Sequence, residues 1–171
     1  EVKGESQIGY ERYINRFTEM LVNTVNNISI TGLKRFGKTS IAKEVISRVK
    51  SQAEVNIITV FVDLAKQKSF SDLLISIVNQ LEDELLEANS VDNFLEHPIY
   101  KRFVERFRSF DPASKSFRDS FDSIFKFVTK QGFKIILTID EFDKASELFE
   151  DTADFEFLNN LPGTKLISKG N

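Results

Sequence analysis

The sequence feature that most constrains the fold is the stretch Gly32–Thr39, which reads GLKRFGKT. It satisfies the pattern G-x-x-x-x-G-K-[ST] at every fixed position. A short apolar run, 28–31, comes before it, and apolar residues at helical spacing follow it from about Lys38 to Gln52. A loop of this pattern lies between a strand and a helix, because its anion must meet the N-terminal end of the helix. The stretch therefore predicts a strand, a loop and a helix in succession within an α/β fold.

Each fixed position of this stretch, which we call the phosphate loop, has a physical role. Gly32 and Gly37 permit backbone torsions that side chains forbid, so that successive N–H groups can surround phosphate oxygens. Lys38 can reach the β- and γ-phosphates of a nucleotide, and the Thr39 hydroxyl can bind Mg²⁺. The residues that we predict to contact the nucleotide are Gly32, Leu33, Lys34, Arg35, Phe36, Gly37, Lys38, Thr39 and Ser40.

The second feature is an apolar run that ends in two carboxylates, 134–141, which reads KIILTIDE. Such continuous apolarity is typical of a strand buried on both faces of a parallel sheet. Acids at the end of a strand can simply be solvated, but in folds with a phosphate loop they lie across the Mg²⁺ from the loop hydroxyl. We therefore predict that Asp140 binds the metal together with Thr39. Glu141 is predicted to polarise the attacking water, and we count it with Lys38 as catalytic.

The remaining pattern predicts helices that alternate with strands. Two further strands are expected at 55–64 and 165–168, and helices at 10–26, about 70–85, within 99–131 with a break near Asp111–Pro112, and over most of 143–161. This alternation implies a parallel sheet with helices on both faces. We expect residues 1–171 to form one nucleotide-binding domain. Because the chain starts without Met and ends just after a strand, we also expect a fragment of a longer multidomain protein, truncated on its C-terminal side.

Composition excludes several function classes. The chain has no cysteine and one histidine, His97, so disulfides and thiolate metal sites are excluded. No apolar run approaches the ~20 residues that span a bilayer, and no signal peptide is recognisable. We therefore expect a cytoplasmic protein that makes no membrane contact.

Charge and aromatic content bear on nucleic acid as a partner. The net charge of −3 gives no overall attraction to a polyanion. Aromatic residues alternate with basic ones over 100–127, which can indicate stacking on single-stranded nucleic acid. However, Phe103, Phe107 and Phe110 follow helical spacing, which favours packing in a core.

The order of the strands and motifs also indicates whether the chain binds ATP or GTP. One strand, 55–64, lies in sequence between the phosphate loop and the acidic strand, as in ATPases that insert an extra strand and use a strand-borne glutamate. A GTPase would carry Asp-x-x-Gly after the acidic strand, whereas Asp140 is followed by Glu-Phe-Asp. No Asn-Lys-x-Asp motif for guanine occurs in the sequence. ATP is therefore the predicted nucleotide.

Four segments together resemble P-loop NTPases of the AAA+/STAND type, close to the prokaryotic "archaeal-type ATPase" domains. The phosphate loop is similar to their Walker A motif, and 135–142 to their Walker B motif. The other two features are 8–11, and 61–64 followed by 69–74. The resemblance spans roughly residues 8–168. It implies a three-layer α/β sandwich around a central parallel sheet, of the ASCE type, with ATP and Mg²⁺ as cofactors.

The resemblance also implies functions for particular residues. Ile8, Gly9 and Tyr10 would contact the adenine, and Ser168 or Lys169 would stand at a sensor position facing the γ-phosphate. Members of the family act as ATP-driven switches or assemblies, often in signalling and defence. The implied partners are therefore further copies of the chain or other protein domains, and the helical lid of the family would lie beyond residue 171.

Three functions remain open at this point. The first is Mg²⁺-dependent ATP hydrolysis that drives a conformational or oligomerisation switch. The second is a non-hydrolysing ATP-binding module, in which Glu141 does not activate water. The third is a small-molecule kinase that uses the same loop; the adjacent acids Asp140 and Glu141 favour hydrolysis over transfer to an acceptor.

Overall fold

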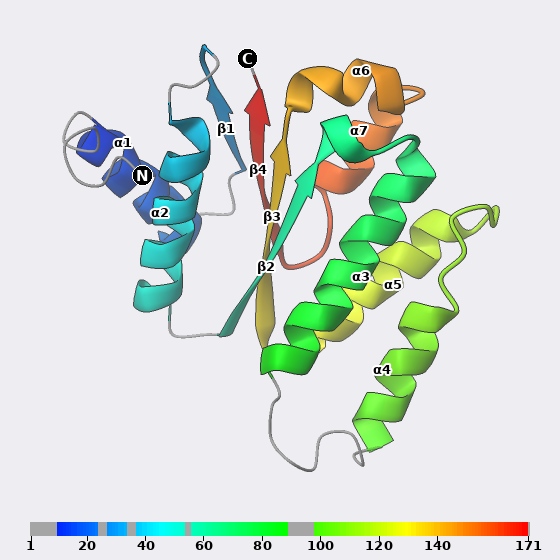
Figure 1. The fold of residues 1–171 in the computed structure, drawn as a ribbon. Helices are drawn as coiled ribbons and strands as arrows, with labels where there is room; N and C mark the ends of the chain where they lie inside the picture. The colour runs from blue at the N-terminus through cyan, green and yellow to red at the C-terminus, as the bar shows by residue number, and fades with distance from the viewer. Residues whose placement is uncertain (1–9, 24–26, 34–36, 54–55, 89–97, 171) are drawn as a thin grey trace.

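The sheet of the computed structural model is fully parallel. The structure describes residues 10–23, 27–33, 37–53, 56–88 and 98–170. Its strands are β1 (Ile28–Thr31), β2 (Asn56–Asp63), β3 (Phe133–Asp140) and β4 (Thr164–Gly170). They are hydrogen-bonded in the order β1-β4-β3-β2 (Figure 1). The predicted parallel sheet is therefore confirmed.

The order of the strands differs from their order in sequence. β4, the last strand along the chain, lies between β1 and β3 and pairs with both. β2, which precedes β3 in sequence, lies at an edge of the described sheet. The extra strand between the phosphate-loop strand and the acidic strand is thus β4. Parallel strands carry their C-terminal ends to one edge, so the phosphate loop, Asp140 and Gly170 meet there.

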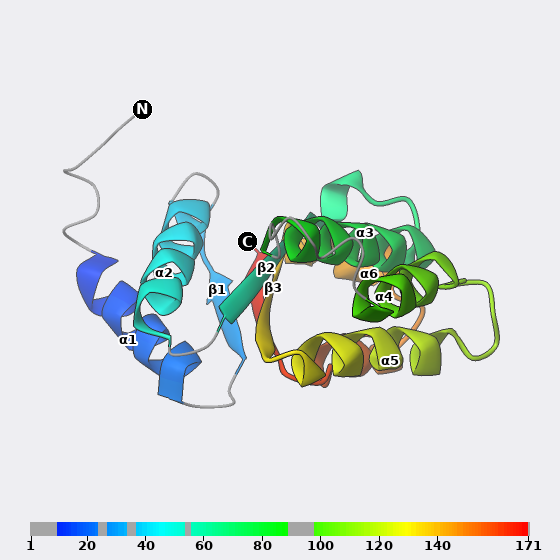
Figure 2. The same ribbon diagram turned by 90° about the horizontal axis from the view of Figure 1, so that it is seen from below.

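Helices cover both faces of the sheet, as expected (Figure 2). One face carries α1 (Glu11–Asn23) and α2 (Lys38–Gln52), and the other carries α3 (Phe70–Ala88) and α5 (Phe117–Lys130), with α4 (Pro98–Arg108) packed outside them. The shorter elements are the 3₁₀ turns η2 (Leu64–Lys66) and η4 (Phe142–Lys144) and the helices α6 (Ala145–Leu148) and α7 (Thr152–Asn159). Among the described residues, no helix is both long and apolar enough to cross a membrane.

Two apolar clusters hold these layers together. The smaller one packs α1 and α2 on the sheet, and its buried members include Ile14, Val45 and Ile136. The larger one lies under α3 and α5, where the rings of Phe121 and Phe125 are fully buried and stack with centroids 4.9 Å apart. Packing is thus the role of the aromatic stretch where the structure describes it, as the helical spacing predicted.

The two helices of the smaller face are also tied at their surface. The Arg48 guanidinium of α2 donates to the Glu11 carboxylate of α1 at 2.6 Å and to Glu44 at 2.8 Å. The hydrogen bond from Arg48 lowers the pKa of Glu11. The pair orients α1 against the helix that begins at the phosphate loop.

An ion pair between Arg118 and a buried carboxylate, Asp154, joins α5 to α7 on the other face. Arg118 Nη2 lies 2.7 Å from Asp154 Oδ1, and the Asp154 side chain is only 7% exposed. The second oxygen, Asp154 Oδ2, accepts from the Glu150 backbone N–H at 3.0 Å. The guanidinium also lies 5.6 Å from the ring centroids of Phe117 and Phe157. Both carboxylate oxygens of this buried acid are therefore satisfied.

Replacement of Asp154 by alanine is expected to lower the free energy of unfolding by about 2 kcal/mol. Arg118 and the Glu150 backbone N–H would both lose the buried carboxylate that accepts their hydrogen bonds. Urea unfolding followed by circular dichroism measures the change. Asp122→Ala is the matched control: Asp122 pairs with Lys126 at 2.6 Å, but the lysine side chain is 61% exposed. The control should leave the midpoint almost unchanged. Equal midpoints for the two variants would contradict the structural role assigned to Asp154.

Candidate nucleotide-binding site

The described part of the phosphate loop has backbone torsions that favour glycine. The φ angle is 152° at Gly32 and 74° at Gly37. A Cβ added at either position would meet no atom within 4 Å, so the requirement for glycine is one of torsion and not of space. Gly37 is the N-cap of α2, and its carbonyl accepts from the Ile41 N–H at 2.9 Å. The first turn of α2 therefore presents its backbone donors directly after the loop.

Lys38 folds back over the loop. Its ammonium donates to the carbonyl oxygens of Gly32 at 2.5 Å and Leu33 at 2.9 Å. The positive charge thus lies beside the loop that is predicted to hold the phosphates. Leu33 itself is 72% exposed, and Ser40 is also exposed.

Several predicted contacts fall on residues outside the described part of the chain. These are Lys34, Arg35 and Phe36 of the loop, and Ile8 and Gly9 of the adenine segment. Their contacts with the nucleotide stay predictions.

Tyr10, the third residue of the adenine segment, is described. It is partly buried and packs against the apolar cluster of α1 and α2. Its contact with adenine is likewise still a prediction.

A buried lysine joins the two predicted metal residues. Lys169, near the end of β4, is 0% exposed. Its ammonium donates to Thr39 Oγ1 at 3.0 Å and to Asp140 Oδ2 at 2.8 Å, and lies 5.0 Å from the ring centroid of Phe61. A buried charge needs such partners. The structure thus brings α2, β2, β3 and β4 together around one cation.

Lys169, and not Ser168, is the residue of the predicted sensor pair that reaches this cluster. Neighbours along a strand point to opposite faces of the sheet. Ser168 is buried at 7% exposure on the strand position that pairs with Ile139. The sequence indicated Lys169 only by resemblance, and Phe61 was not predicted as a site residue. The available signal for Lys169 was a lysine placed directly after the apolar run of the last strand.

The end of the acidic strand has a strained turn. Asp140 Oδ1 accepts from the Glu141 backbone N–H at 2.9 Å, and the Asp140 side chain is 22% exposed. Glu141 has φ 51° and ψ 45°, and within the described residues it is the one non-glycine residue with positive φ. A non-glycine residue in this region costs about 1–3 kcal/mol, and such residues concentrate at functional sites. The geometry therefore marks Glu141 independently of any motif.

The turn at Glu141 also sets the structure of the next segment of the chain. η4 begins at Phe142, so Asp143 lies inside a 3₁₀ turn. The segment predicted as mostly helical is split into α6 and α7, and Asp151 caps α7 by accepting from the N–H groups of Ala153 and Asp154. The early turn holds the backbone of Glu141 against the Asp140 carboxylate.

The residues present fit a nucleotide-linked Mg²⁺. Mg²⁺ in proteins commonly takes one or two side-chain oxygens together with waters and substrate phosphates. A hydroxyl, Thr39, and a carboxylate, Asp140, face one point here. No group of three or more His, Cys, Asp or Glu among the described residues could hold a metal by itself. A metal at Thr39 and Asp140 would therefore depend on phosphates for its remaining ligands.

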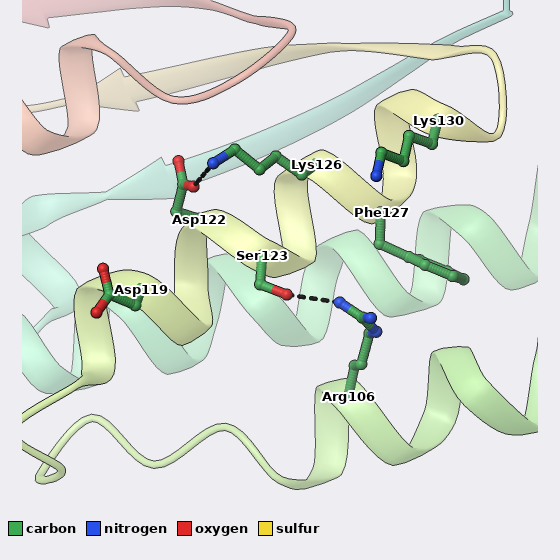
Figure 3. Close-up of a pocket in the computed structure, with 7 residues that line it drawn as sticks. All are labelled: Arg106, Asp119, Asp122, Ser123, Lys126, Phe127 and Lys130. Carbon is green, nitrogen blue, oxygen red and sulfur yellow. Dashed lines mark hydrogen bonds and ion pairs between the residues drawn. The ribbon is translucent and has the colours of Figure 1, made fainter.

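A separate hollow lies between α4 and α5, away from this edge of the sheet (Figure 3). Some of the polar groups that line it are paired across the two helices and along α5. Arg106 donates to Ser123 at 2.5 Å and lies 5.4 Å from the Phe127 ring centroid, while Lys126 pairs with Asp122. These contacts are typical of two packed helices.

Comparison with known proteins extends these observations. The family described as "ATPase domain predominantly from Archaea" matches residues 11–160. The ORC2 protein of Aeropyrum pernix, in its ADPNP–ADP complexes, has a similar fold, with a TM-score of 0.64 and 14% identity over 99% of this chain. The ORC1 protein of Aeropyrum pernix, in complex with DNA, gives a TM-score of 0.62 and 16% identity over 95% of this chain.

The chain spans less than half of both solved proteins, 42% of the ORC2 chain and 38% of the ORC1 chain. Curated protein sequences give no significant match. The family match covers most of the chain. This chain therefore belongs to the family of ATPase domains found predominantly in Archaea, with the fold of a P-loop NTPase of the AAA+ type.

Proposed function

We propose that this chain binds ATP together with Mg²⁺ at the phosphate loop and hydrolyses it to ADP and phosphate. The observation that carries this proposal is the convergence of Thr39 and Asp140, from separate elements, within 3.0 Å and 2.8 Å of one cationic nitrogen. The loop and the N-terminus of α2 adjoin the same point. The Aeropyrum ORC2 structures with ADPNP and ADP support nucleotide binding in this fold.

The residues have distinct tasks in this proposal. The loop N–H groups and Lys38 bind the β- and γ-phosphates, and Thr39 and Asp140 hold the metal against them. When bound, Mg²⁺ neutralises charge that develops on the phosphates. Glu141 orients the attacking water and accepts its proton while the bond between the γ-phosphorus and the bridging oxygen breaks. The hydrogen bond from its N–H to Asp140 fixes the turn that carries it.

We further propose that hydrolysis switches the conformation or assembly of a longer protein that carries this domain. Contacts made only by the γ-phosphate are lost when it leaves, so elements that they hold are released. A STAND-type switch in signalling or defence, in the cytoplasm, is the role that the family resemblance favours. The ORC1 protein was solved with DNA, but we do not propose DNA as a partner of this chain. This chain has a net charge of −3, which gives no overall attraction to DNA.

Phosphate release measured with ATP and GTP, each with Mg²⁺ and with EDTA, tests the proposal. We expect turnover that needs Mg²⁺ and that is at least about tenfold faster with ATP, because no guanine-reading motif occurs in the sequence. Tight ATP binding without turnover would favour the non-hydrolysing module. Turnover that appears only with a small-molecule acceptor would favour a kinase.

A further inference from the structure

We propose that Lys169 is a built-in cation that competes with Mg²⁺ for Thr39 and Asp140. The ammonium hydrogen-bonds both side chains while no nucleotide is bound, and so prevents the metal from binding alone. The inference rests on the proposed function, because it concerns the same site.

The contacts of Lys169 are the first argument. An ammonium has three donors, and two of them go to Thr39 Oγ1 at 3.0 Å and Asp140 Oδ2 at 2.8 Å. The Phe61 ring lies against the nitrogen at 5.0 Å. The side chain is 0% exposed, so water does not solvate the charge. The lysine nitrogen therefore lies between the same two oxygens that the metal would use.

Charge balance is the second argument. One carboxylate, Asp140, neutralises one ammonium, Lys169, in this arrangement. A divalent metal added at the same oxygens would lie against the ammonium, with Asp140 as the carboxylate that both cations contact, and like charges at a few ångströms repel strongly. The negative phosphates of a nucleotide remove this conflict, because they attract both the metal and the ammonium. Metal and nucleotide are therefore expected to bind together, and metal alone only weakly.

Binding of Mn²⁺ alone, followed by electron paramagnetic resonance, tests the competition. Lys169→Met removes the charge and keeps a long apolar side chain, and should bind Mn²⁺ roughly tenfold more tightly than the unchanged chain, or better. Lys169→Gln, measured in parallel, should show the same gain and keeps the test valid if the methionine variant does not fold. Lys169→Arg keeps the charge and should bind Mn²⁺ as weakly as the unchanged chain.

Two controls assign the gain to this site. Lys165→Met changes a lysine at the other end of the same strand and should leave Mn²⁺ binding unchanged. Asp140→Asn added to Lys169→Met should abolish the gain, because the metal loses its carboxylate. Unchanged Mn²⁺ affinity in folded Lys169→Met and Lys169→Gln variants would overturn the inference and leave Lys169 a purely structural ion pair.

A fluorescent ATP analogue with Mg²⁺ separates this inference from the proposed function. If the unchanged chain binds the analogue while the uncharged Lys169 variants gain no Mn²⁺ affinity, the competition is wrong and the ATP site stands. If Mn²⁺ affinity rises as predicted but no analogue binds to any variant, the proposed function fails and the cation competition stands.

Discussion

Replacement of Lys38 by alanine is expected to weaken ATP binding by about 100-fold or more. The lysine is the one loop side chain predicted to reach the β- and γ-phosphates, and charged hydrogen bonds to phosphate contribute about 1.5–3 kcal/mol each. Its ammonium already lies at the loop carbonyls of Gly32 and Leu33. Equilibrium titration with a fluorescent ATP analogue in the presence of Mg²⁺ measures the loss.

Lys43→Ala is the matched control for this prediction. Lys43 lies on the same helix, α2, but is exposed and follows the first turn. Its replacement should change the affinity less than about twofold, since an exposed charge outside the binding turn is screened by solvent. Equal losses for Lys38→Ala and Lys43→Ala would show that the loop lysine makes no specific phosphate contact.

Replacement of Glu141 by glutamine is expected to lower ATP turnover by about 10²–10⁴-fold while leaving ATP affinity within a few-fold of the original. A general base contributes a factor of this size, and the glutamine amide cannot accept the proton of the attacking water. The side chains are nearly equal in size, so the strained turn at φ 51° should persist. Single-turnover phosphate release and analogue binding, measured on the same samples, separate the two effects.

Glu156→Gln is the matched control for Glu141→Gln. Glu156 is an exposed residue of α7, and its replacement should leave both turnover and affinity unchanged. Normal turnover by Glu141→Gln would contradict the role of Glu141 and would require another base.

Much of the fold is readable from sequence because it depends on local pattern. The β-branched runs predicted β2 and β3 to within about two residues, and the motif with its flanking apolar residues predicted the helix that begins at Lys38. Gly132, with φ 87°, follows the end of α5 closely, as a glycine after a helix commonly does. These features are set by residues close together in the chain.

The features that sequence did not predict depend on contacts between distant residues. The place of β4 between β1 and β3 is a matter of topology, and no local pattern encodes it. The contact of Lys169 with Thr39 joins residues 130 positions apart. The left-handed backbone of Glu141 could not be predicted from sequence either. Two adjacent acids can begin a helix as readily as they can form a strained turn. That turn also places Asp143 inside a 3₁₀ turn.

In the candidate site, too, the local segments could be predicted from sequence and the contacts between distant residues could not. The phosphate loop and the acidic strand end were predicted as separate segments, and the parallel sheet explains why they meet at one edge. Burial of a lysine among the predicted metal residues was not foreseen, since lysine is rarely fully buried unless it is paired. The pairing with Asp140 supplies that partner.

Calorimetric titration of the unmodified chain with ATP and Mg²⁺ tests the central claim most directly. We predict saturable binding of one ATP per chain, with affinity that falls when EDTA removes the metal. The absence of any saturable heat from ATP, on a chain that is folded by circular dichroism, would contradict the assignment of this edge of the sheet as a nucleotide site.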